Sequence, residues 1–311
     1  MQVNATKNRV GGVIRSRIAL YIRALLSGSD NGVPEWTPLV EEGEDTGLFK
    51  PTDAAWVVHA DVATMIGGIR ALLLQALHPG SLAGVMQHSR YEEDALGRLS
   101  GTIRWLTICT FGSKEALEVE SVRVREMHER VKGKFANNDG TERNYKASDT
   151  DLLMWVHVAF TDSFLTAHQH YGVKEINPDE YVRQWAGAVT PLGVVNTPSN
   201  FDELKATLAS YDSQLRVDDK TKRVIKFIQN PPTFTGMTKL VYSIMFSAAF
   251  HLLTEEQQKA IGVKAMPKEV ALPLATFIME TIRFILGPNS PLETAALNRH
   301  LRVTKPSQSS Y

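Results

Sequence analysis

Two helix-like segments between Arg98 and Gly133 each place polar side chains where an amphipathic helix should be apolar. The first contains four residues at positions i, i+4, i+7 and i+11, the spacing of one stripe on an α-helix: Arg98, Thr102, Trp105 and Cys109. This stripe combines a forked cation and a hydroxyl with apolar groups. Because buried polar groups are normally hydrogen-bonded, the stripe predicts a polar partner or a ligand inside the core.

The second segment has a histidine in the middle of its apolar face. Leu117, Val124 and Val131 recur every seven residues, and His128 lies between the last two, four residues after one and three before the other. Residues with this spacing share one face of a helix. Two interpretations are open: an interior histidine hydrogen-bonded to a neighbour, or an imidazole that binds a cofactor. Haem requires one such imidazole.

Composition limits the classes of function. The chain has 311 residues, 43% of them hydrophobic, which is enough for one large domain or two modest ones. Its formal net charge is zero, and no basic pattern interleaved with aromatic residues occurs, so nucleic acid is not an expected partner. The single cysteine, Cys109, excludes an intrachain disulfide framework and any cysteine cluster for zinc or iron–sulfur.

Helical periodicity interrupted by Pro, Gly and Asn continues along most of the chain. Strand-like alternation is never sustained for more than a few residues, so the sequence predicts an all-α fold in a single large helical domain. A polar loop is expected at Phe135–Arg143, and the Ser148–Asp151 spacing predicts a capping box at the start of a third central helix. The predicted divisions are an N-terminal basic helix and linker (1–34), a helical domain (35–303) and a disordered tail (304–311).

The segment before Asp30 is basic and amphipathic. It contains five basic residues and no acidic one: Lys7, Arg9, Arg15, Arg17 and Arg23. The segment lacks the long apolar core of a secretory signal, and no apolar run reaches the ~18–20 residues that span a bilayer. We expect a cytoplasmic protein whose first helix packs on its body. Two alternatives stay open, namely peripheral contact with an anionic membrane and an organellar transit peptide.

Four short motifs in order resemble the MpaB-type oxygenase family, to which the rubber-cleaving latex clearing protein belongs. They are Ala76-Leu77-His78-Pro79, Arg98-Leu99-x-x-Thr102, His128-x-x-Val131-x-Gly133 and Trp155-Val156-His157. The resemblance covers roughly residues 52–172 well and the C-terminal half only loosely. It implies a helical protein with a globin-like core that holds haem b.

The resemblance also implies roles for individual residues. His128 matches the histidine that ligates haem iron, and Arg98 and Thr102 match the active-site pair that polarises oxygen or substrate. Gly101 stands where the rubber oxygenase has a lysine able to cap the iron, so the opposite iron site is expected to be open or held by another group such as His78. No residue matches the rubber oxygenase's catalytic acid.

Two further histidines are candidates for the haem pocket, each with a structural alternative. His78 lies at a helix end, where an imidazole can simply bond the last carbonyls of the helix. His157 lies on a stripe with Thr161, Phe164 and His168, which predicts a buried polar seam. It is either a hydrogen-bonded core residue or a group that orients another pocket side chain.

The expected function is that of a haem-dependent oxygenase acting with dioxygen on a hydrophobic substrate of isoprenoid or lipid type. Two alternatives from other classes remain. One is a haem protein without turnover, either a sensor or a store, and the other is a helical protein that binds a hydrophobic ligand and whose polar seam is structural.

Overall fold

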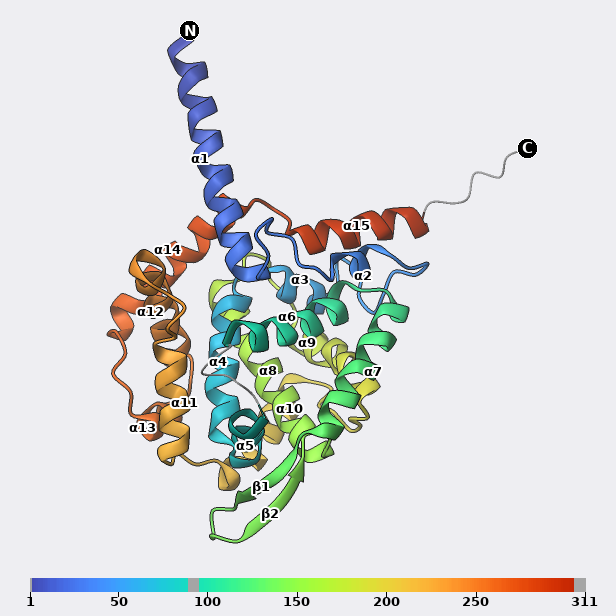
Figure 1. The fold of residues 1–311 in the computed structure, drawn as a ribbon, viewed down its shortest axis with the longest axis vertical. Coiled ribbons are helices and arrows are strands. Elements are labelled where there is room, and N and C mark those ends of the chain that lie inside the picture. The colour runs from blue at the N-terminus through green and yellow to red at the C-terminus, as the bar shows by residue number, and fades with distance from the viewer. Residues whose placement is uncertain (1, 89–94, 305–311) are drawn as a thin grey trace, which may run out of the picture.

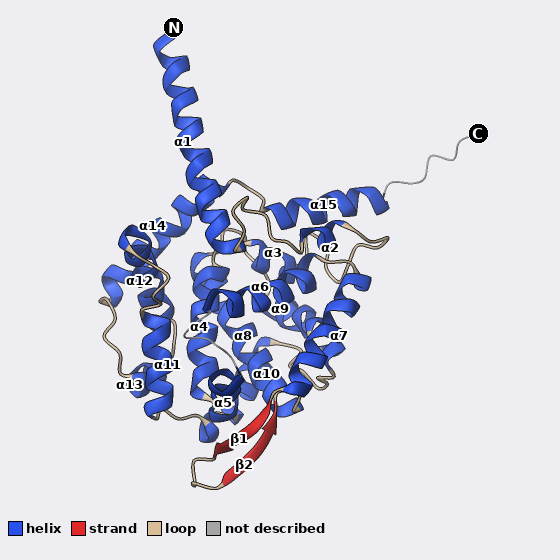
Figure 2. Ribbon diagram, viewed as in Figure 1, coloured by secondary structure: helices blue, strands red, loops and turns tan. Residues whose placement is uncertain are grey.

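The protein is almost entirely helical, which confirms the all-α prediction. A computed structural model describes residues 2–88 and 95–304, with the side chains of 2–11, 13, 14, 26 and 95–98 outside the description. This part of the chain forms fifteen α-helices, three short 3₁₀ helices and one two-stranded sheet. Figure 2 shows the sheet as the one departure from helix among the described elements.

The α-helices and strands follow one another along the chain in this order: α1 Gln2–Ser27, α2 Thr37–Glu41, α3 Ala54–Ala60, α4 Thr64–Leu77, α5 Pro79–His88, α6 Ala95–Phe111, α7 Lys114–Arg130, β1 Lys132–Ala136, β2 Glu142–Lys146, α8 Thr150–Tyr171, α9 Pro178–Trp185, α10 Phe201–Ser210, α11 Asp219–Gln229, α12 Gly236–His251, α13 Glu255–Ile261, α14 Lys268–Leu286 and α15 Pro291–Thr304. The 3₁₀ helices are η1 Ala186–Ala188, η2 Thr190–Leu192 and η3 Asp212–Gln214.

Helices α4 and α8 pack against each other at the centre of the molecule (Figure 1). Helix α4 is apolar on nearly every side, and Ile66, Leu73 and Leu74 are fully buried. Gly67 allows the two helices to approach closely, because a Cβ there would lie 2.8 Å from the Cδ1 atom of Phe164 in α8. A larger residue would force the two helices apart.

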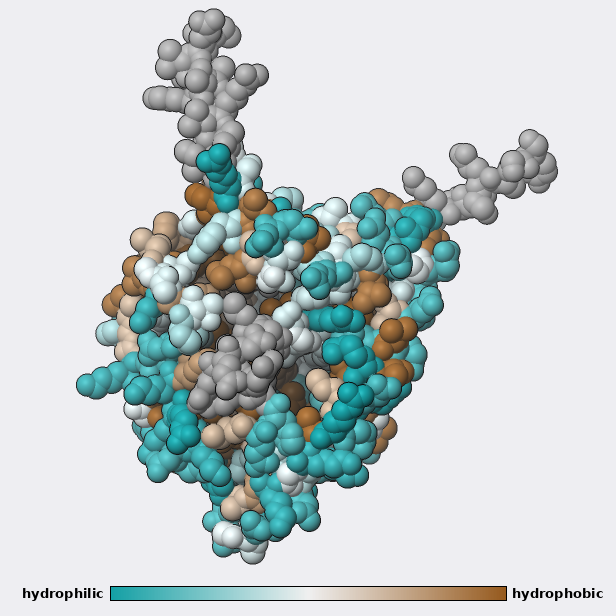
Figure 3. Space-filling model, viewed as in Figure 1, coloured by the Kyte–Doolittle hydropathy of each residue, from teal (hydrophilic) through white to brown (hydrophobic). Residues whose placement is uncertain are grey.

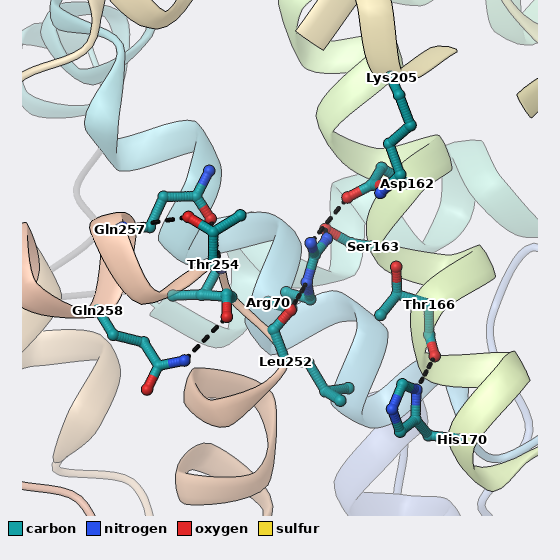
Figure 4. A network of polar contacts seen from close by, with 11 residues as sticks. Arg70, Asp162, Ser163, Thr166, His170, Lys205, Leu252, Thr254, Gln257 and Gln258 are labelled. Carbon is teal, nitrogen blue, oxygen red and sulfur yellow. Dashed lines mark hydrogen bonds and ion pairs between the residues drawn. The ribbon is translucent and has the colours of Figure 1, made fainter. Parts of the chain in front are cut away.

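A buried charge network ties this central pair to its neighbours (Figure 4). The guanidinium of Arg70 in α4 lies 2.7 Å from the carboxylate of Asp162 in α8, and both side chains are at most 4% exposed. Arg70 also donates to Ser163 Oγ (2.8 Å) and to the carbonyl of Leu252 (3.0 Å). Lys205 of α10 pairs with the other carboxylate oxygen. The network therefore links α4, α8, α10 and the end of α12.

The remaining helices surround the central pair in two groups. Helices α11 to α14 lie together on one side, where α12 packs against both α4 and α14 (left in Figure 1). Helices α6, α7 and α9 lie on the other side, and α1 projects from the body, contacting α14. Helices α6 and α7, which contain most of the Arg98–Gly133 region, therefore lie near α8, and a site can form between these three helices.

The predicted loop at Phe135–Arg143 is the turn of a β-hairpin together with the adjoining ends of its two strands. Strands β1 and β2 pair antiparallel, with Gly133 opposite Tyr145 and Phe135 opposite Arg143. Their side chains are largely polar and exposed, so the alternating apolar pattern that identifies a strand is nearly absent. Tyr145 is the exception, since it is only 3% exposed and packs with Ala83 and Leu152.

The helix end predicted at His78 is correct, and the capping box predicted at Ser148 is not. Helix α4 ends before His78, whose extended backbone precedes Pro79. A capping box does form at the start of α13, between Thr254 and Gln257. At the start of α8 the N-cap residue is Asp149 rather than Ser148. The carboxylate of Asp149 accepts a hydrogen bond from the amide of Lys146 in the preceding turn, so no capping box forms.

Helix α15 ends at Thr304, and residues 305–311, which make up the rest of the predicted tail, lie outside the described part. Within that part, no single helix combines the length and apolarity needed to cross a bilayer, although two sharply bent pairs, α3 with α4 and α14 with α15, meet those criteria together. The predicted boundaries at residues 34 and 303 and the globin-like character of the core stay predictions.

Candidate functional site

A cavity of about 600 Å³ lies among α5, α6, α7, α8 and the hairpin, reaching the α9–η2 segment. Its volume falls within the range of roughly 300–1,000 Å³ typical of ligand pockets. Most of the wall is apolar, with contributions from every surrounding element: Val85, Trp105, Leu106, Val124, Met127, Val131, Leu152, Leu153, Val156, Phe160, Trp185, Ala188, Val189 and Leu192. Such a lining suits a hydrophobic molecule.

Helix α6 contributes the predicted stripe to this wall. Thr102 and Trp105 both line the cavity, and Cys109, two turns after Thr102, is buried in the core. Arg98 belongs to the same helix, one turn before Thr102, but its side chain lies outside the described part. Gly101 also lines the cavity, and a Cβ built there meets no atom within 4 Å. The wall is therefore open at that position.

His128 lines the same cavity from the last turn of α7. Its position follows from the predicted apolar face, since Leu117 and Val124 are buried. The ring makes no hydrogen bond to another described residue. Burial, together with the nearby positive charge of Arg123, lowers the pKa of His128 below its ordinary value. The imidazole is accordingly neutral at neutral pH and keeps a nitrogen lone pair for a metal or a donor.

His157 reaches the cavity from α8 on the buried polar seam that the sequence predicts. His157, Thr161 and His168 are each at most 4% exposed. The Nδ1 atom of His157 is buried without a hydrogen-bond partner among the described residues. Burial lowers the pKa of His157 to about 4, so this ring is neutral as well. A buried ring nitrogen without a partner is uncommon, so the hydrogen-bonding capacity of His157 is not fully used by the described residues.

His78 does not line the cavity within the described part, and both of its ring nitrogens have partners. Its Nδ1 atom accepts from the amides of Gly80 (3.2 Å) and Ser81 (3.3 Å), which are free at the start of α5. Its Nε2 atom lies 3.3 Å from the side-chain oxygen of Gln214. The structural alternative predicted bonds to the last carbonyls of the preceding helix, whereas the ring accepts from the first free amides of α5. A role as iron ligand stays a prediction.

Periodicity missed several polar residues of the cavity wall, among them His88 and Arg123. Arg123 lines the wall near His128, although its helical position lies away from the apolar stripe. Its guanidinium pairs with Glu120, a carboxylate only 1% exposed that also binds Arg104. A long side chain can reach around a helix in this way while its Cα faces elsewhere. In the sequence, only the length of the arginine side chain and the nearby carboxylate of Glu120 indicate that Arg123 can lie at the cavity wall.

The comparison with known families agrees with this geometry. A family model described as the catalytic domain of the ER-bound oxygenase mpaB/B' and rubber oxygenase matches residues 56–284. The chain belongs to this oxygenase family. No curated protein and no solved structure gives a significant match. The matched region contains every candidate site residue and confirms the resemblance drawn from the four motifs.

The family identifies the chain as having an oxygenase catalytic domain, and its site is built around imidazoles rather than a cluster of metal ligands. Within the described residues no group of three or more His, Cys, Asp or Glu side chains is arranged to hold a metal ion. A cofactor that brings most of its own iron ligands requires only one protein imidazole. His128 and His157 are the two cavity imidazoles from the predicted set.

Proposed function

We propose that the protein is a haem-b-dependent oxygenase acting on a hydrophobic, isoprenoid or lipid-like substrate. The observation that carries the proposal is the position of His128, an imidazole that has no hydrogen-bond partner among the described residues and lies at the wall of a large apolar cavity in an oxygenase-family chain. An apolar cavity with few placed polar groups is what a porphyrin and a hydrocarbon chain both require.

The cavity residues fit haem in their chemistry. His128 would hold the iron, and the unpartnered Nδ1 atom of His157 offers a second polar contact inside the wall. When bound, haem supplies iron able to activate dioxygen. The apolar lining excludes water from the reacting region, which strengthens electrostatic interactions there.

Arg98 and Thr102 would act on oxygen or substrate from α6. Thr102 presents a hydroxyl at the cavity wall, and Arg98 lies one helical turn earlier. A guanidinium keeps its charge at any working pH and offers several donors in a fixed plane, which suits an oxygen atom that gains negative charge. Thr102 would orient the same atom through its hydroxyl group.

Absorption spectra of the His128→Ala variant test the haem assignment. Full-length protein expressed with haem available should show a Soret band, and the variant should lose most of it because the iron loses its protein ligand. His170→Ala is the matched control, since His170 is an exposed histidine on α8 whose ring bonds the carbonyl of Thr166. A colourless, iron-free wild type would contradict the haem proposal.

Turnover separates the oxygenase from the sensor or store alternative. The haem-loaded, reduced protein is expected to consume dioxygen in the presence of one or more members of a panel of isoprenoids and lipids. Oxygen binding without consumption across the whole panel would favour a sensor or store. A protein that binds the lipids but never haem would support the hydrophobic-ligand alternative.

We also propose that the base of α1 and the outer face of α14 contact an anionic membrane surface. Helix α14 exposes one apolar stripe (39–70% exposed): Val270, Leu274, Phe277 and Phe284. Exposed apolar residues on α1 adjoin it, and brown side chains are visible where α1 meets the body in Figure 3. The guanidinium of Arg15 lies 4.8 Å from the ring centre of Phe284.

Charge identifies the partner of this face. The first 29 residues carry five basic side chains and no acidic one, which attracts anionic lipid, although Glu269 and Glu280 on α14 reduce the effect. The location of the protein would then be the cytoplasmic side of a membrane.

Vesicle flotation tests the membrane proposal. The Phe277→Ser/Phe284→Ser variant should bind phosphatidylglycerol-containing vesicles at least about tenfold more weakly than wild type, since burying one Phe contributes ~1.5–3 kcal/mol. The control Val173→Ser/Val195→Ser removes two apolar residues of comparable exposure that do not belong to α1 or α14. Equal binding to neutral vesicles, or a stable dimer that hides this face, would count against the proposal.

A further inference from the structure

Arg123 is unusual among the described residues that line the cavity. No other lining residue in the described part of the chain is a lysine, arginine, aspartate or glutamate. Placing a positive charge beside apolar groups costs free energy unless a negative group lies close to it. The negative groups near the Arg123 guanidinium therefore determine what it can bind.

Glu120 compensates only part of this charge. Its carboxylate accepts from Arg123 Nε at 3.0 Å, and a second bond joins it to the NH2 group. Arg104 binds the same carboxylate at 2.9 Å. Two guanidinium groups thus share one buried carboxylate, which leaves the group of three with a net charge of +1.

The Arg123 side chain lines the cavity and keeps donor capacity that Glu120 does not use. Glu120 occupies the Nε and NH2 groups, while the NH1 group has no hydrogen bond within the described residues. The Arg123 side chain is 41% exposed, whereas Glu120 behind it is 1% exposed. The carboxylate therefore fixes the guanidinium from the protein side and leaves donor capacity on the other side. A donor held in this way loses little freedom when it binds a ligand.

We propose that Arg123 binds a carboxylate of the molecule held in the cavity. The inference rests on the proposed function and adds the chemical class of one anchoring group. A carboxylate carries one negative charge, equal to the surplus of the Arg104–Glu120–Arg123 group, and its oxygens match the donors of a guanidinium. A phosphate, with a charge of about −1.5 to −2, would exceed that surplus.

Two sources of this carboxylate are chemically equivalent at Arg123. One is a propionate group of haem, whose iron His128 would hold on the same wall. The other is the acid group of a fatty-acid-like substrate whose chain follows the apolar lining. The experiment therefore has one arm for each source, and each arm compares an acid with its neutral analogue.

The first arm uses the full-length chain loaded with haem or with haem dimethyl ester, in which both propionates are esterified. The transfer of each to excess apomyoglobin is followed in wild type, Arg123→Gln and Arg130→Gln. Arg130 is an 80% exposed arginine paired with Glu126 that does not line the cavity, so it is the matched control. If Arg123 binds a propionate, Arg123→Gln should release haem at least about tenfold faster, the gain expected from one charged hydrogen bond, and leave the ester unchanged.

The second arm measures binding of a long-chain fatty acid and of the corresponding alcohol to the same proteins by displacement of a fluorescent lipid probe. If the substrate supplies the carboxylate, only the acid should bind at least about tenfold more weakly to Arg123→Gln. Arg123→Lys, which keeps the charge but loses the fork, should fall between wild type and Arg123→Gln. Arg104 still pairs with Glu120 in both variants, so the buried carboxylate keeps a partner.

The inference is overturned if neither acid discriminates wild type from Arg123→Gln, or if acid and neutral analogue weaken equally. Wild type that fails to prefer either acid over its neutral analogue overturns it as well. Failure of the haem proposal is a distinct result: the protein would then take up no haem, while the fatty-acid arm would still report on Arg123.

Discussion

Asp162→Asn is expected to destabilise the protein by ~3–5 kcal/mol, because it leaves the buried Arg70 guanidinium without its counter-charge. Both partners are almost fully excluded from solvent, and Arg70 joins α4 to α8 and to the end of α12. Denaturant unfolding of the variant should show a lower midpoint. Glu126→Gln, which removes one partner of an exposed pair, is the control and should change stability by less than ~1 kcal/mol.

A double variant separates charge from packing. Arg70→Met with Asp162→Leu removes both charges and should recover much of the lost stability, since apolar replacements of buried ion pairs are often tolerated. An Asp162→Asn protein as stable as wild type would show that the pair is not buried in solution.

The same carboxylate should contribute to acid sensitivity. Burial alone would raise the pKa of Asp162, but Arg70 and Lys205 outweigh it and lower the pKa below its ordinary value. A carboxyl whose pKa is lower in the folded state stabilises the fold above its unfolded pKa of about 3.9 and loses that contribution as pH falls toward the folded value. The difference in stability between wild type and Asp162→Asn should therefore narrow on acidification below about pH 4.

Arg98→Lys is expected to reduce turnover by roughly 100- to 1,000-fold, the usual loss when one donor to a developing negative charge is removed. The lysine keeps the positive charge but loses the planar fork, so haem content and melting temperature should stay near those of wild type. Oxygen consumption, Soret absorbance and thermal unfolding are measured on the same preparations. Arg130→Lys, on the exposed side of α7, is the control.

The alternative for Arg98 predicts a different pattern. If this arginine only covers a buried carboxylate, Arg98→Ala should lower the melting temperature markedly, because removing one partner of a buried pair typically costs ~3–5 kcal/mol. Stable, haem-replete and fully active variants would remove Arg98 from the mechanism.

The sequence was most informative where a helix must bury one face. The spacing of Leu117, Val124 and His128 was sufficient to place the histidine on the inner side of α7, and the structure puts it at the cavity wall. Four motifs were sufficient for the family, which the comparison confirms. The roles of individual site residues stay predictions.

Hydrophobic periodicity could not predict features that depend on the length of a side chain or on contacts between residues far apart in the sequence. Arg123 enters the cavity through the length of its side chain, and the β-hairpin is stabilised by pairing rather than by an alternating apolar face. The partner of the His78 Nε2 atom, Gln214, lies more than a hundred residues away in the sequence and could not be assigned before the fold was known. Local patterns contain no information on such partners.

A substitution at Gly101 would affect the stability of α6 and the size of the cavity at the same time. It lies inside α6, where glycine costs up to ~1 kcal/mol of helix stability relative to alanine, and a Cβ there would enter open space. An added side chain would strengthen the helix and at the same time narrow the cavity next to Thr102. Selection for heat resistance and selection for a bulky guest therefore act in opposite directions on this one position.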